Sequence, residues 1–296
     1  MRFNEGFPFF VDPAIKAKKH CRERIMKIAR LLTEEGKICL GSIETDRPEE
    51  ARIVRGDLFG KLEITKQRDR IGRLLSPLVP PNILAVGLNY GGHAEETKIS
   101  KPENPVLFIK ATTSVIGLDE LILLPLAGPD QVDYEAELAI IIGRKAKNVS
   151  REDALRCVLG YTCANDISAR DWQIDKQKKQ WARGKSFDTF CPLGPCLVTR
   201  DEIPDPNSLR LRAILNGQVM QDSNTSEMIF DVQSLISDLS RSLTLLPGTV
   251  ILTGTPEGVG FTRKPPVFLR EGDTITVEIE KIGNLTNKVS RESDNG

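Results

Sequence analysis

Short apolar segments separated by glycine and proline dominate the chain from about residue 82 onwards. Each is only a few residues long and rich in valine, isoleucine and leucine, which favours strands over helices. The predicted strands are 83–87, 106–110, 138–142, 195–198, 210–215, 250–253 and 274–279. Because they do not alternate regularly with helices, the pattern argues against a doubly wound parallel sheet and predicts an α+β domain.

Two helices are predicted among these strands. Ser150 and Asp153 are spaced like a capping box ahead of the apolar stretch 154–159. Asp231 is a predicted N-cap for a second helix, because apolar residues recur at helical spacing over 235–243.

The first 76 residues form a predicted small N-terminal α/β domain, followed by a catalytic domain over 77–296. A proline-rich stretch at 75–82 marks the boundary. The domain is expected to contain a helix with Ile25, Ile28, Ala29 and Leu32 on one face and Gly36 as its C-cap, then strands at 38–43 and 58–64. A polar tail from about residue 290 is expected to be disordered.

The balance of charged residues argues against nucleic acid or an anionic membrane as a partner. Lys+Arg and Asp+Glu both total 41, so the basic excess that nucleic acid or an anionic membrane favours is absent. No apolar run approaches the length of a membrane span, which takes about 18 residues. Residues 1–6 show no secretory or Arg-rich transit pattern, and the 6 cysteines show no disulfide framework. We therefore expect free thiols and a cytoplasmic location, or the mitochondrial matrix in a eukaryote.

Acidic residues two apart in an apolar run suggest a metal site. Side chains alternate along a strand, so Glu135 and Glu137 are predicted to point the same way, roughly 7 Å apart. Buried carboxylates facing one another need a cation between them. Asp166, predicted at a strand end, is a third acid, and such ligands suit Mg²⁺ or Mn²⁺. The alternative for the pair alone is a solvated acidic strand face.

The sequence also contains a candidate general base. His93 and Glu96 are three residues apart just after a predicted strand, so on a helix the carboxylate would orient the imidazole. A surface histidine near a chance glutamate is the alternative. The residues Gly184-Lys185-Ser186 do not complete a Walker A motif, because Lys179 stands where its first glycine belongs. The glycine-rich stretch 253–260 is either a tight turn or a cradle of backbone amides for a carboxylate.

Several of these motifs, in this order, resemble the fumarylacetoacetate hydrolase superfamily. They are Glu135-x-Glu137, Asn-Asp-Ile-Ser-Ala-Arg-Asp at 165–171, Gly-Lys-Ser-Phe-Asp at 184–188 and Thr-Gly-Thr-Pro-Glu-Gly-Val-Gly at 253–260. Segments at 171–173, 189–195 and 263–269 are most similar to the domain-containing protein 2 branch. The resemblance runs from about residue 82 to 289, and the first 76 residues have no comparable motif.

The resemblance implies a mixed β-roll or barrel-like catalytic fold, a homodimer and a Mg²⁺ or Mn²⁺ ion. The implied metal ligands are Glu135, Glu137 and Asp166; the implied catalytic residues are His93, Glu96 and Lys185; and the implied substrate-binding residues are Lys110, Arg170, Gln173 and Thr255. His93 and Glu96 match a dyad on a lid that orders over substrate.

The expected substrate is a small anionic 2-oxo or 1,3-dicarbonyl acid. Lys185, Arg170 and Lys110 would offset the negative charge of the metal ligands and accept a substrate carboxylate, while the ion stabilises an enolate. Acylpyruvate hydrolysis, oxaloacetate decarboxylation and oxaloacetate tautomerisation share that enolate, and the residues do not rank them. A catalytically silent binding protein with this fold is the alternative from another class.

Overall fold

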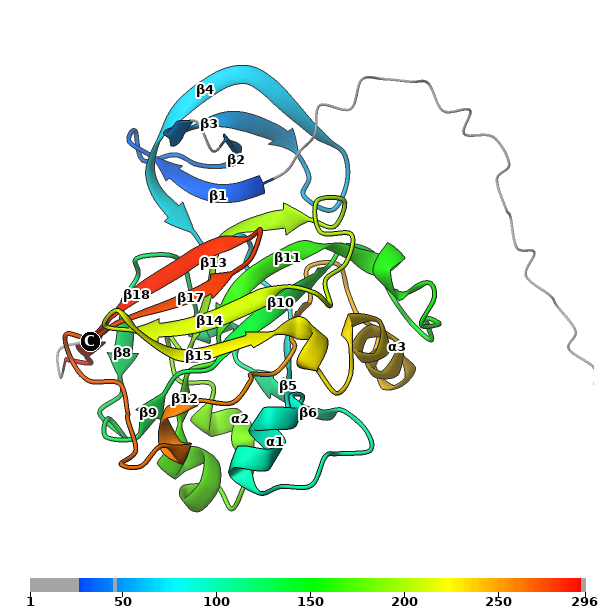
Figure 1. The fold of residues 1–296 in the computed structure, drawn as a ribbon. Coiled ribbons are helices and arrows are strands. Elements are labelled where there is room, and N and C mark those ends of the chain that lie inside the picture. The colour runs from blue at the N-terminus through cyan, green and yellow to red at the C-terminus, as the bar shows by residue number, and fades with distance from the viewer. Residues whose placement is uncertain (1–26, 45–46, 294–296) are drawn as a thin grey trace, which may run out of the picture.

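A computed structural model describes residues 27–44 and 47–293 of the chain. Two β-sheets form the body of the molecule (Figure 1). The larger sheet has the order β2-β3-β4-β1-β13-β11-β10-β16-β5-β6, with β7 beside β13, and the smaller has the order β15-β14-β17-β18-β8. A short pair, β9 and β12, lies outside both sheets.

The strands of the large sheet are β1 (Lys27–Thr33), β2 (Ile38–Glu44), β3 (Arg47–Gly56), β4 (Leu62–Leu75), β5 (Ile83–Gly87), β6 (Val106–Lys110), β7 (Val115–Ile116), β10 (Ala136–Ile142), β11 (Val158–Asn165), β13 (Cys191–Thr199) and β16 (Val250–Leu252). The others are β8 (Ile122–Leu124), β9 (Val132–Asp133), β12 (Ser168–Ala169), β14 (Arg210–Leu215), β15 (Gln218–Asn224), β17 (Thr274–Ile279) and β18 (Gly283–Arg291). Each strand predicted from residue 82 onwards is present.

Helices are few and short, as the strand-rich pattern predicts. The α-helices are α1 (Gly91–Thr97), α2 (Trp181–Gly184) and α3 (Val232–Ser242), and η3 (Asp171–Lys176) is a π-helix. Single 3₁₀ turns occur at η1 (Thr112–Ser114), η2 (Ala154–Cys157), η4 (Thr225–Glu227) and η5 (Gly260–Thr262). None of the helices in the described ranges has the length and apolar character needed to cross a bilayer.

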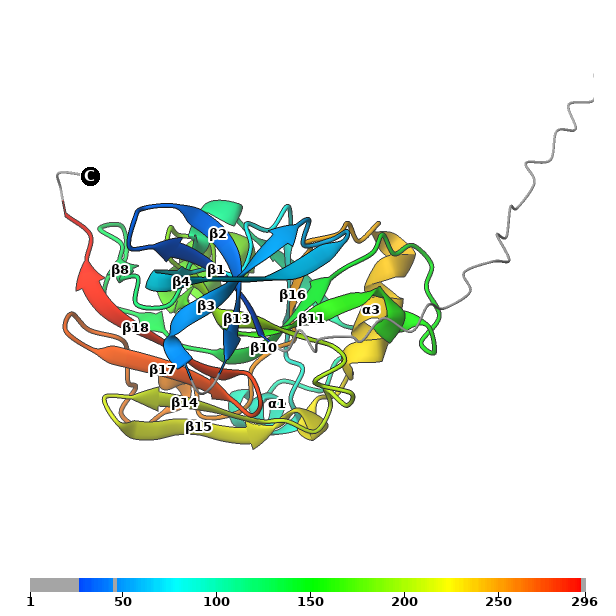
Figure 2. The same cartoon turned by 90° about the horizontal axis from the view of Figure 1, so that it is seen from above.

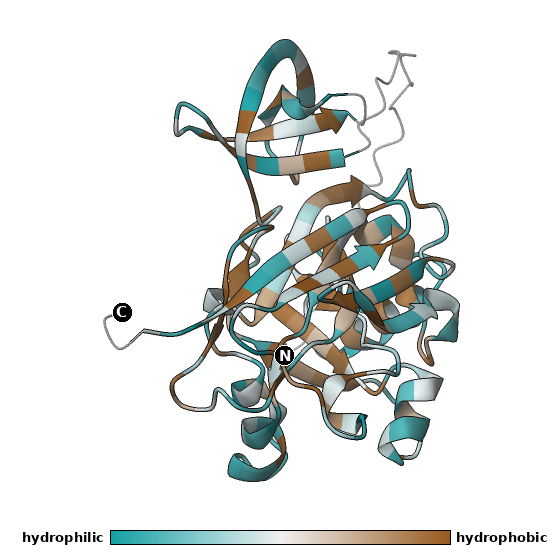
Figure 3. Cartoon of the chain, turned by 60° about the vertical axis from the view of Figure 1, so that its left-hand side comes forward, coloured by the Kyte–Doolittle hydropathy of each residue, from teal (hydrophilic) through white to brown (hydrophobic). Residues whose placement is uncertain are grey.

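Strand β10 lies at the centre of the core, and all of its residues are buried. Its side chains alternate between two apolar clusters. Leu138 and Ile140 belong to the larger cluster, which includes residues of β14 and β17, whereas Ala139 and Ile141 belong to a second cluster with residues of β5 and β16. Apolar residues accordingly concentrate on the central strands (Figure 3). A strand covered on both faces reads as a continuous apolar run, which is the pattern of 138–142.

The N-terminal strands form a closed antiparallel ring, since β1 pairs with both β2 and β4 and β3 pairs with β2 and β4. This ring lies at the end of the molecule away from α1 and α2 (Figure 1), and from above it covers the large sheet near β13 (Figure 2). Strand β1 connects this ring to the rest of the large sheet, because its Lys27 and Ile28 pair with Val198 and Leu197 of β13.

The predicted N-terminal helix is wrong. Ile28, Ala29 and Leu32 lie on β1, while Ile25 lies outside the described residues. Ile28, Ala29 and Leu31 are all buried, because β1 is covered on more than one side. The strict alternation of a half-exposed strand is lost there, and the remaining apolar spacing imitates a helix.

Two smaller predictions also need correction. The helix expected at 154–159 is a single 3₁₀ turn, because Val158 and Leu159 already belong to β11, where Val158 pairs with Ile142 of β10. The predicted disordered tail starts too early in the sequence, at residue 290. Ser290 and Arg291 extend β18, where they pair with Leu123 and Leu124 of β8, and residues 294–296 lie outside the described part.

Candidate active site

The candidate site lies along one edge of the large sheet, where several strands begin or end together. Strands β10 and β11 are antiparallel, with Ala136 opposite Asn165, so the start of β10 meets the end of β11. The ends of β5 and β16 reach the same edge, because β16 is parallel to β5 and antiparallel to β10. Chain segments far apart in sequence therefore present their polar residues to one another here.

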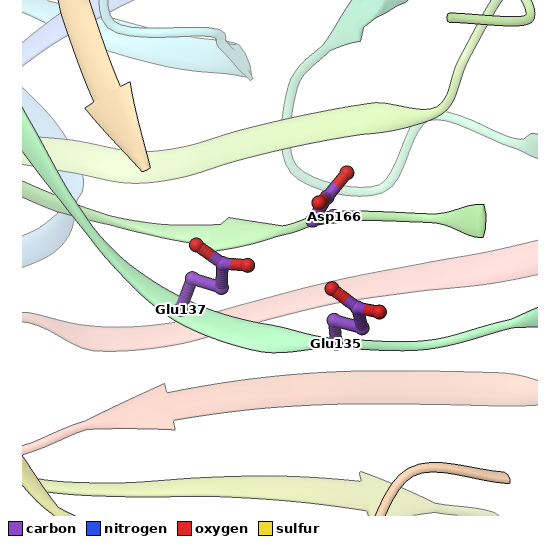
Figure 4. A group of neighbouring side chains, drawn as sticks. All are labelled: Glu135, Glu137 and Asp166. Carbon is purple, nitrogen blue, oxygen red and sulfur yellow. The ribbon is translucent and has the colours of Figure 1, made fainter. Parts of the chain in front are cut away.

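Glu135, Glu137 and Asp166 converge at this edge (Figure 4). One ligand oxygen from each can be chosen so that all lie within 4.8 Å of one another, and all three residues are buried. The register explains the convergence, because Asp166 directly follows β11 and its backbone N–H donates to the carbonyl of Glu135 at 2.9 Å. The prediction that the two glutamates share a face is confirmed, although Glu135 lies just before β10 rather than within it.

Glu137 is a buried carboxyl group surrounded by negative charge. Burial and the neighbouring Asp166 and Glu135 raise the pKa of Glu137 well above its usual value. Its Oε2 accepts a hydrogen bond from the Gly254 N–H at 2.6 Å, and it makes no ion pair with a described residue. Gly254 has φ +92°, and a Cβ there would lie 2.7 Å from that of Asn89, so glycine is needed for this approach.

Buried cations face the other two acids. Lys185 Nζ donates to Glu135 Oε2 at 2.9 Å and to Asp166 Oδ2 at 2.7 Å, and Lys110 Nζ donates to Asp166 Oδ1 at 2.5 Å. Arg170 Nη1 pairs with Glu135 Oε1 at 2.7 Å. Burial raises the pKa of Glu135, but Lys185 and Arg170 outweigh it and hold that pKa below its usual value. The predicted cations thus surround the acids.

Asp133 is an additional site residue that the sequence analysis missed. Its Oδ2 accepts from Arg170 Nε at 2.9 Å and from the Phe261 N–H at 3.0 Å, and its Oδ1 accepts from the Gly260 N–H at 2.8 Å. Asp133 therefore joins Arg170 to the loop that carries Phe261, whose ring lies 4.3 Å below the guanidinium. The signal was present, because Asp133 continues the two-residue spacing of Glu135 and Glu137.

The predicted dyad is formed on α1. His93 Nδ1 and Glu96 Oε1 are 2.7 Å apart, as the spacing of three residues on a helix predicts. Glu96 Oε2 accepts from the Gly258 N–H and the Thr262 hydroxyl, each at 3.0 Å. Partial burial of Glu96 raises its pKa, but the hydrogen bond from His93 and that from Gly258 outweigh it and lower the pKa. A carboxylate held in this way orients the imidazole.

A cavity of about 260 Å³ opens beside these groups. The predicted site residues that line it are His93, Glu135, Arg170, Gln173, Lys185 and Thr255. Of the others, Glu96 holds His93, and Lys110 and Asp166 bond to Lys185, whereas Glu137 accepts from the Gly254 N–H. Apolar side chains form much of the remaining wall, including Ile99, Phe108, Ile174 and Trp181.

Like Lys110 and Arg170, the other two residues expected to bind substrate already have protein partners. Gln173 Oε1 accepts from Arg170 Nη1 at 2.9 Å. The Thr255 hydroxyl donates to the Ala136 carbonyl at 3.0 Å and accepts from Gln221 at 2.8 Å, which holds the glycine-rich loop against the start of β10. Their contact with substrate stays a prediction.

The donor set fits a hard divalent cation. Carboxylate oxygens are the ligands that Mg²⁺ and Mn²⁺ prefer, and three carboxylates meet in a buried position. Glu137 is independent evidence for a bound cation. Its carboxyl group is fully buried next to two other acids, and it has no ion-pair partner among the described residues. A divalent ion would relieve that repulsion.

Comparison with known proteins identifies the class. Residues 82–290 match the family described as fumarylacetoacetate (FAA) hydrolase C-terminal, which agrees with the extent of the sequence motifs. The chain belongs to this family, and it is an enzyme of the family. Its arrangement of mixed sheets with few helices is the α+β fold of the family.

Two curated proteins and one solved structure are similar to this chain over most of its length. The chain is 48% identical over 226 residues to the fumarylacetoacetate hydrolase domain-containing protein 2 homolog of Dictyostelium discoideum, covering 73% of this chain and 74% of that one. It is 48% identical to the human protein named oxaloacetate tautomerase FAHD2A, mitochondrial, covering 73% of this chain and 68% of that one. Among solved structures, the 5-carboxymethyl-2-hydroxymuconate delta-isomerase of Mycobacterium smegmatis matches with a TM-score of 0.79 at 42% identity, covering 90% of this chain and 100% of that one.

Proposed function

We propose that this enzyme interconverts the keto and enol forms of oxaloacetate. The observation that carries the proposal is the placement of His93: Glu96 holds its Nδ1, and the ring borders the cavity that Glu135, Lys185 and Arg170 also line. A proton-transfer reaction needs an oriented base and positive charge beside the enolate. The His93–Glu96 dyad would provide the first, and Lys185 and Arg170 together with a bound divalent ion would provide the second. The name of the human relative supports oxaloacetate as the substrate.

The proton transfer follows from the dyad. When Glu96 accepts a hydrogen bond from the Nδ1–H group, Nε2 of the neutral imidazole is the basic nitrogen. We propose that it removes a proton from C3 of oxaloacetate and returns it to the oxygen on C2, which gives the enol. The Glu96 carboxylate stabilises the imidazolium that exists between the two transfers.

The negative charge of the enolate is the second requirement. Lys185 and Arg170 border the cavity and supply fixed positive charge where water is largely excluded, so their effect is stronger than in bulk solvent. Mg²⁺ or Mn²⁺, bound by Glu135, Glu137 and Asp166, would supply Lewis-acid stabilisation of the same charge. Because Lys185 and Arg170 are buried, their charges are already in position before the substrate binds.

Hydrolysis of an acylpyruvate is the second candidate, and the apolar wall favours it. Ile99, Phe108, Ile174 and Trp181 would pack against the apolar acyl group of such a substrate. In that reaction His93 would activate a water molecule instead of removing a proton from carbon. Decarboxylation of oxaloacetate and catalytically silent binding are the remaining alternatives.

One experiment separates these reactions. Enol-oxaloacetate and acetylpyruvate are each mixed with enzyme and Mg²⁺ or Mn²⁺, and the ultraviolet absorbance of the enol is followed. We expect faster loss of enol-oxaloacetate absorbance while total oxaloacetate stays constant. Formation of pyruvate from oxaloacetate would indicate decarboxylation, and acetate from acetylpyruvate would indicate hydrolysis. Absence of metal-dependent turnover in every assay would contradict the proposal.

Two further expectations belong with this function. A homodimer is expected, and light scattering should then give twice the chain mass of 32.9 kDa. The cytoplasm is the expected compartment, with the mitochondrial matrix as the alternative in a eukaryotic cell; the name of the human relative describes that protein as mitochondrial. Fractionation of the source cells distinguishes the two.

A further inference from the structure

The cations deepest in the cavity are already committed to carboxylates of the protein. Lys185 bonds to Glu135 and Asp166, and Arg170 bonds to Asp133 and Glu135. Both cations are predicted from the sequence to bind a substrate carboxylate, but each would have to share its charge with an acid of the protein. The remaining lysine that lines the cavity is Lys179. Its ammonium makes no ion pair with any residue in the described ranges.

Charge in the buried cluster limits what the inner site accepts. Four carboxylates lie there together with three basic side chains, namely Asp133, Glu135, Glu137, Asp166, Lys110, Arg170 and Lys185. With every group ionised and a divalent ion bound, the cluster carries one net positive charge. It therefore neutralises one carboxylate of a substrate, and a second carboxylate needs a cation from elsewhere.

Lys179 is placed to supply that cation. It is solvent-exposed, unlike Lys185, and it lies on the turn between η3 and α2. The turn is defined, because the Lys179 N–H donates to the Ile174 carbonyl at 3.2 Å and the residue has φ +65°. Ile174 and Trp181, on either side of the turn, line the same cavity. Lys179 thus lies at the solvent-exposed rim, across an apolar wall from the buried cluster, and is not ion-paired within the described part of the chain.

We propose that Lys179 binds the second carboxylate of the substrate and so makes the site selective for dicarboxylates. The inference rests on the proposed function and adds to it the class of acid that the cavity prefers. The first carboxylate and the 2-oxo group lie at the buried end, near His93 and Lys185. The remote carboxylate then reaches the rim, where the ammonium group of Lys179 stabilises it by a charge-assisted hydrogen bond. Lys179 determines specificity and takes no part in proton transfer.

The chain offers a matched control for the test. Lys178 is also exposed, has the same charge and has φ +50°, but it does not line the cavity. Lys179→Met and Lys178→Met therefore remove the same charge from neighbouring left-handed positions. Any effect of net charge or of backbone strain is common to both variants, and only contact with the substrate differs.

The probes are oxaloacetate and its 4-ethyl ester, which differ in the charge of the remote carboxylate. For Lys179→Met we expect KM for oxaloacetate to rise about tenfold with kcat nearly unchanged, because one charge-assisted contact is lost. KM for the ester should stay at the wild-type value. Lys178→Met should match wild type for both, and Lys179→Arg should restore most of the affinity for oxaloacetate.

A second readout does not depend on turnover. Calorimetry with malate and 2-hydroxybutyrate, which differ by a terminal carboxylate, should show tighter binding of malate by wild type and loss of that preference in Lys179→Met. Equal effects of the two Lys→Met substitutions, or equal loss for oxaloacetate and ester, would overturn the inference. If wild type turns over neither probe, the proposed function fails, and the malate preference still decides the role of Lys179.

Discussion

At the scale of single residues, Glu137 shows most directly why the site calls for a cation. Its carboxyl group is buried beside Asp166 and Glu135, and its pKa is raised by burial and by these neighbours. In the metal-free protein this group destabilises the fold, since an ionised carboxylate there is repelled and poorly solvated. A bound divalent ion would attract all three carboxylates and so offset this repulsion.

Glu137→Gln tests this reasoning. We expect the metal-free variant to unfold at the same temperature as wild type or higher, because a buried charge is removed. We also expect it to lose the stabilisation by Mg²⁺ or Mn²⁺, which for wild type amounts to about 2.7 kcal/mol at a concentration one hundred times Kd. Thermal unfolding with and without chelator measures both. Glu95→Gln, at an exposed position on α1, should keep the wild-type response. A full metal response in Glu137→Gln would exclude this residue as a ligand.

His93 and Glu96 are the second test at this scale. His93→Gln should lower kcat for tautomerisation by about 10²- to 10⁴-fold, the usual contribution of a general base. Glu96→Gln keeps a hydrogen-bond acceptor but removes the charge, so a smaller loss is expected. Steady-state kinetics at neutral pH measures both, and circular dichroism checks that the fold is kept. Wild-type kcat in His93→Gln would rule out the proposed proton transfer.

At the scale of elements, α3 shows how local signals decide a helix. Asp231 was predicted as its N-cap, and its side chain accepts a hydrogen bond from the Ser234 N–H at 2.9 Å. It also pairs with the exposed guanidinium of Arg151. Burial raises the pKa of Asp231, but Arg151 and the Ser234 N–H outweigh it and lower the pKa. The buried face of the helix carries Leu235, Ile236 and Leu239, as its spacing predicts.

The cap predicts a stability difference that depends on pH. Asp231→Ala should lower the free energy of unfolding by about 1 kcal/mol at pH 7, the usual value of a cap. A carboxyl group with a lowered folded pKa stabilises above its unfolded pKa of about 3.9 and loses this effect as pH falls through the folded value. The gap between wild type and variant should therefore close below about pH 4. Denaturant unfolding at several pH values measures it. Asp238→Ala, in the interior of the same helix, should show no such gap, and a gap independent of pH would contradict the assignment.

At the scale of the whole molecule, the N-terminal strands and the catalytic sheet are one structure. Strand β1 closes the N-terminal ring and pairs with β13, and Ile28 belongs to the same apolar cluster as Leu193 and Leu197 of β13. The proposed boundary near residue 76 therefore separates segments that share part of their core. We expect both to unfold together.

Ile28→Ala tests that coupling. Removing a buried isoleucine side chain should cost about 2–5 kcal/mol of unfolding free energy, because it leaves a cavity between the ring and the sheet. The transition should remain single when followed by tryptophan fluorescence and by circular dichroism. Ile38→Ala is the control, since Ile38 is 54% exposed and should change stability by no more than about 0.5 kcal/mol. Two separate transitions would show instead that the N-terminal ring unfolds on its own.

A structural feature could be predicted from the sequence when the residues that cause it are close together in the chain. The strands at 83–87 and 210–215 and the cap at Asp231 were predicted, because their periodicity and capping chemistry lie within a few consecutive residues. The N-terminal helix was predicted wrongly, since the burial of β1 depends on its pairing with β13, far along the chain. Neighbouring residues contain no information about that partner.

The sequence by itself determined the kinds of groups available for chemistry: the closely spaced acids Glu135 and Glu137, the His93–Glu96 dyad and the scarcity of histidine, which points to oxygen ligands. These follow from residue type and short spacing, which any strand or helix preserves. Only the tertiary structure decided which groups meet. The pairing of Ala136 with Asn165 brings Asp166 to the glutamates. The folding of distant segments commits Lys185 and Arg170 to carboxylates, while Lys179 at the rim has no ion-pair partner among the residues that the structure describes. Charge neutralisation acts through space, and the fold decides which charges are neighbours.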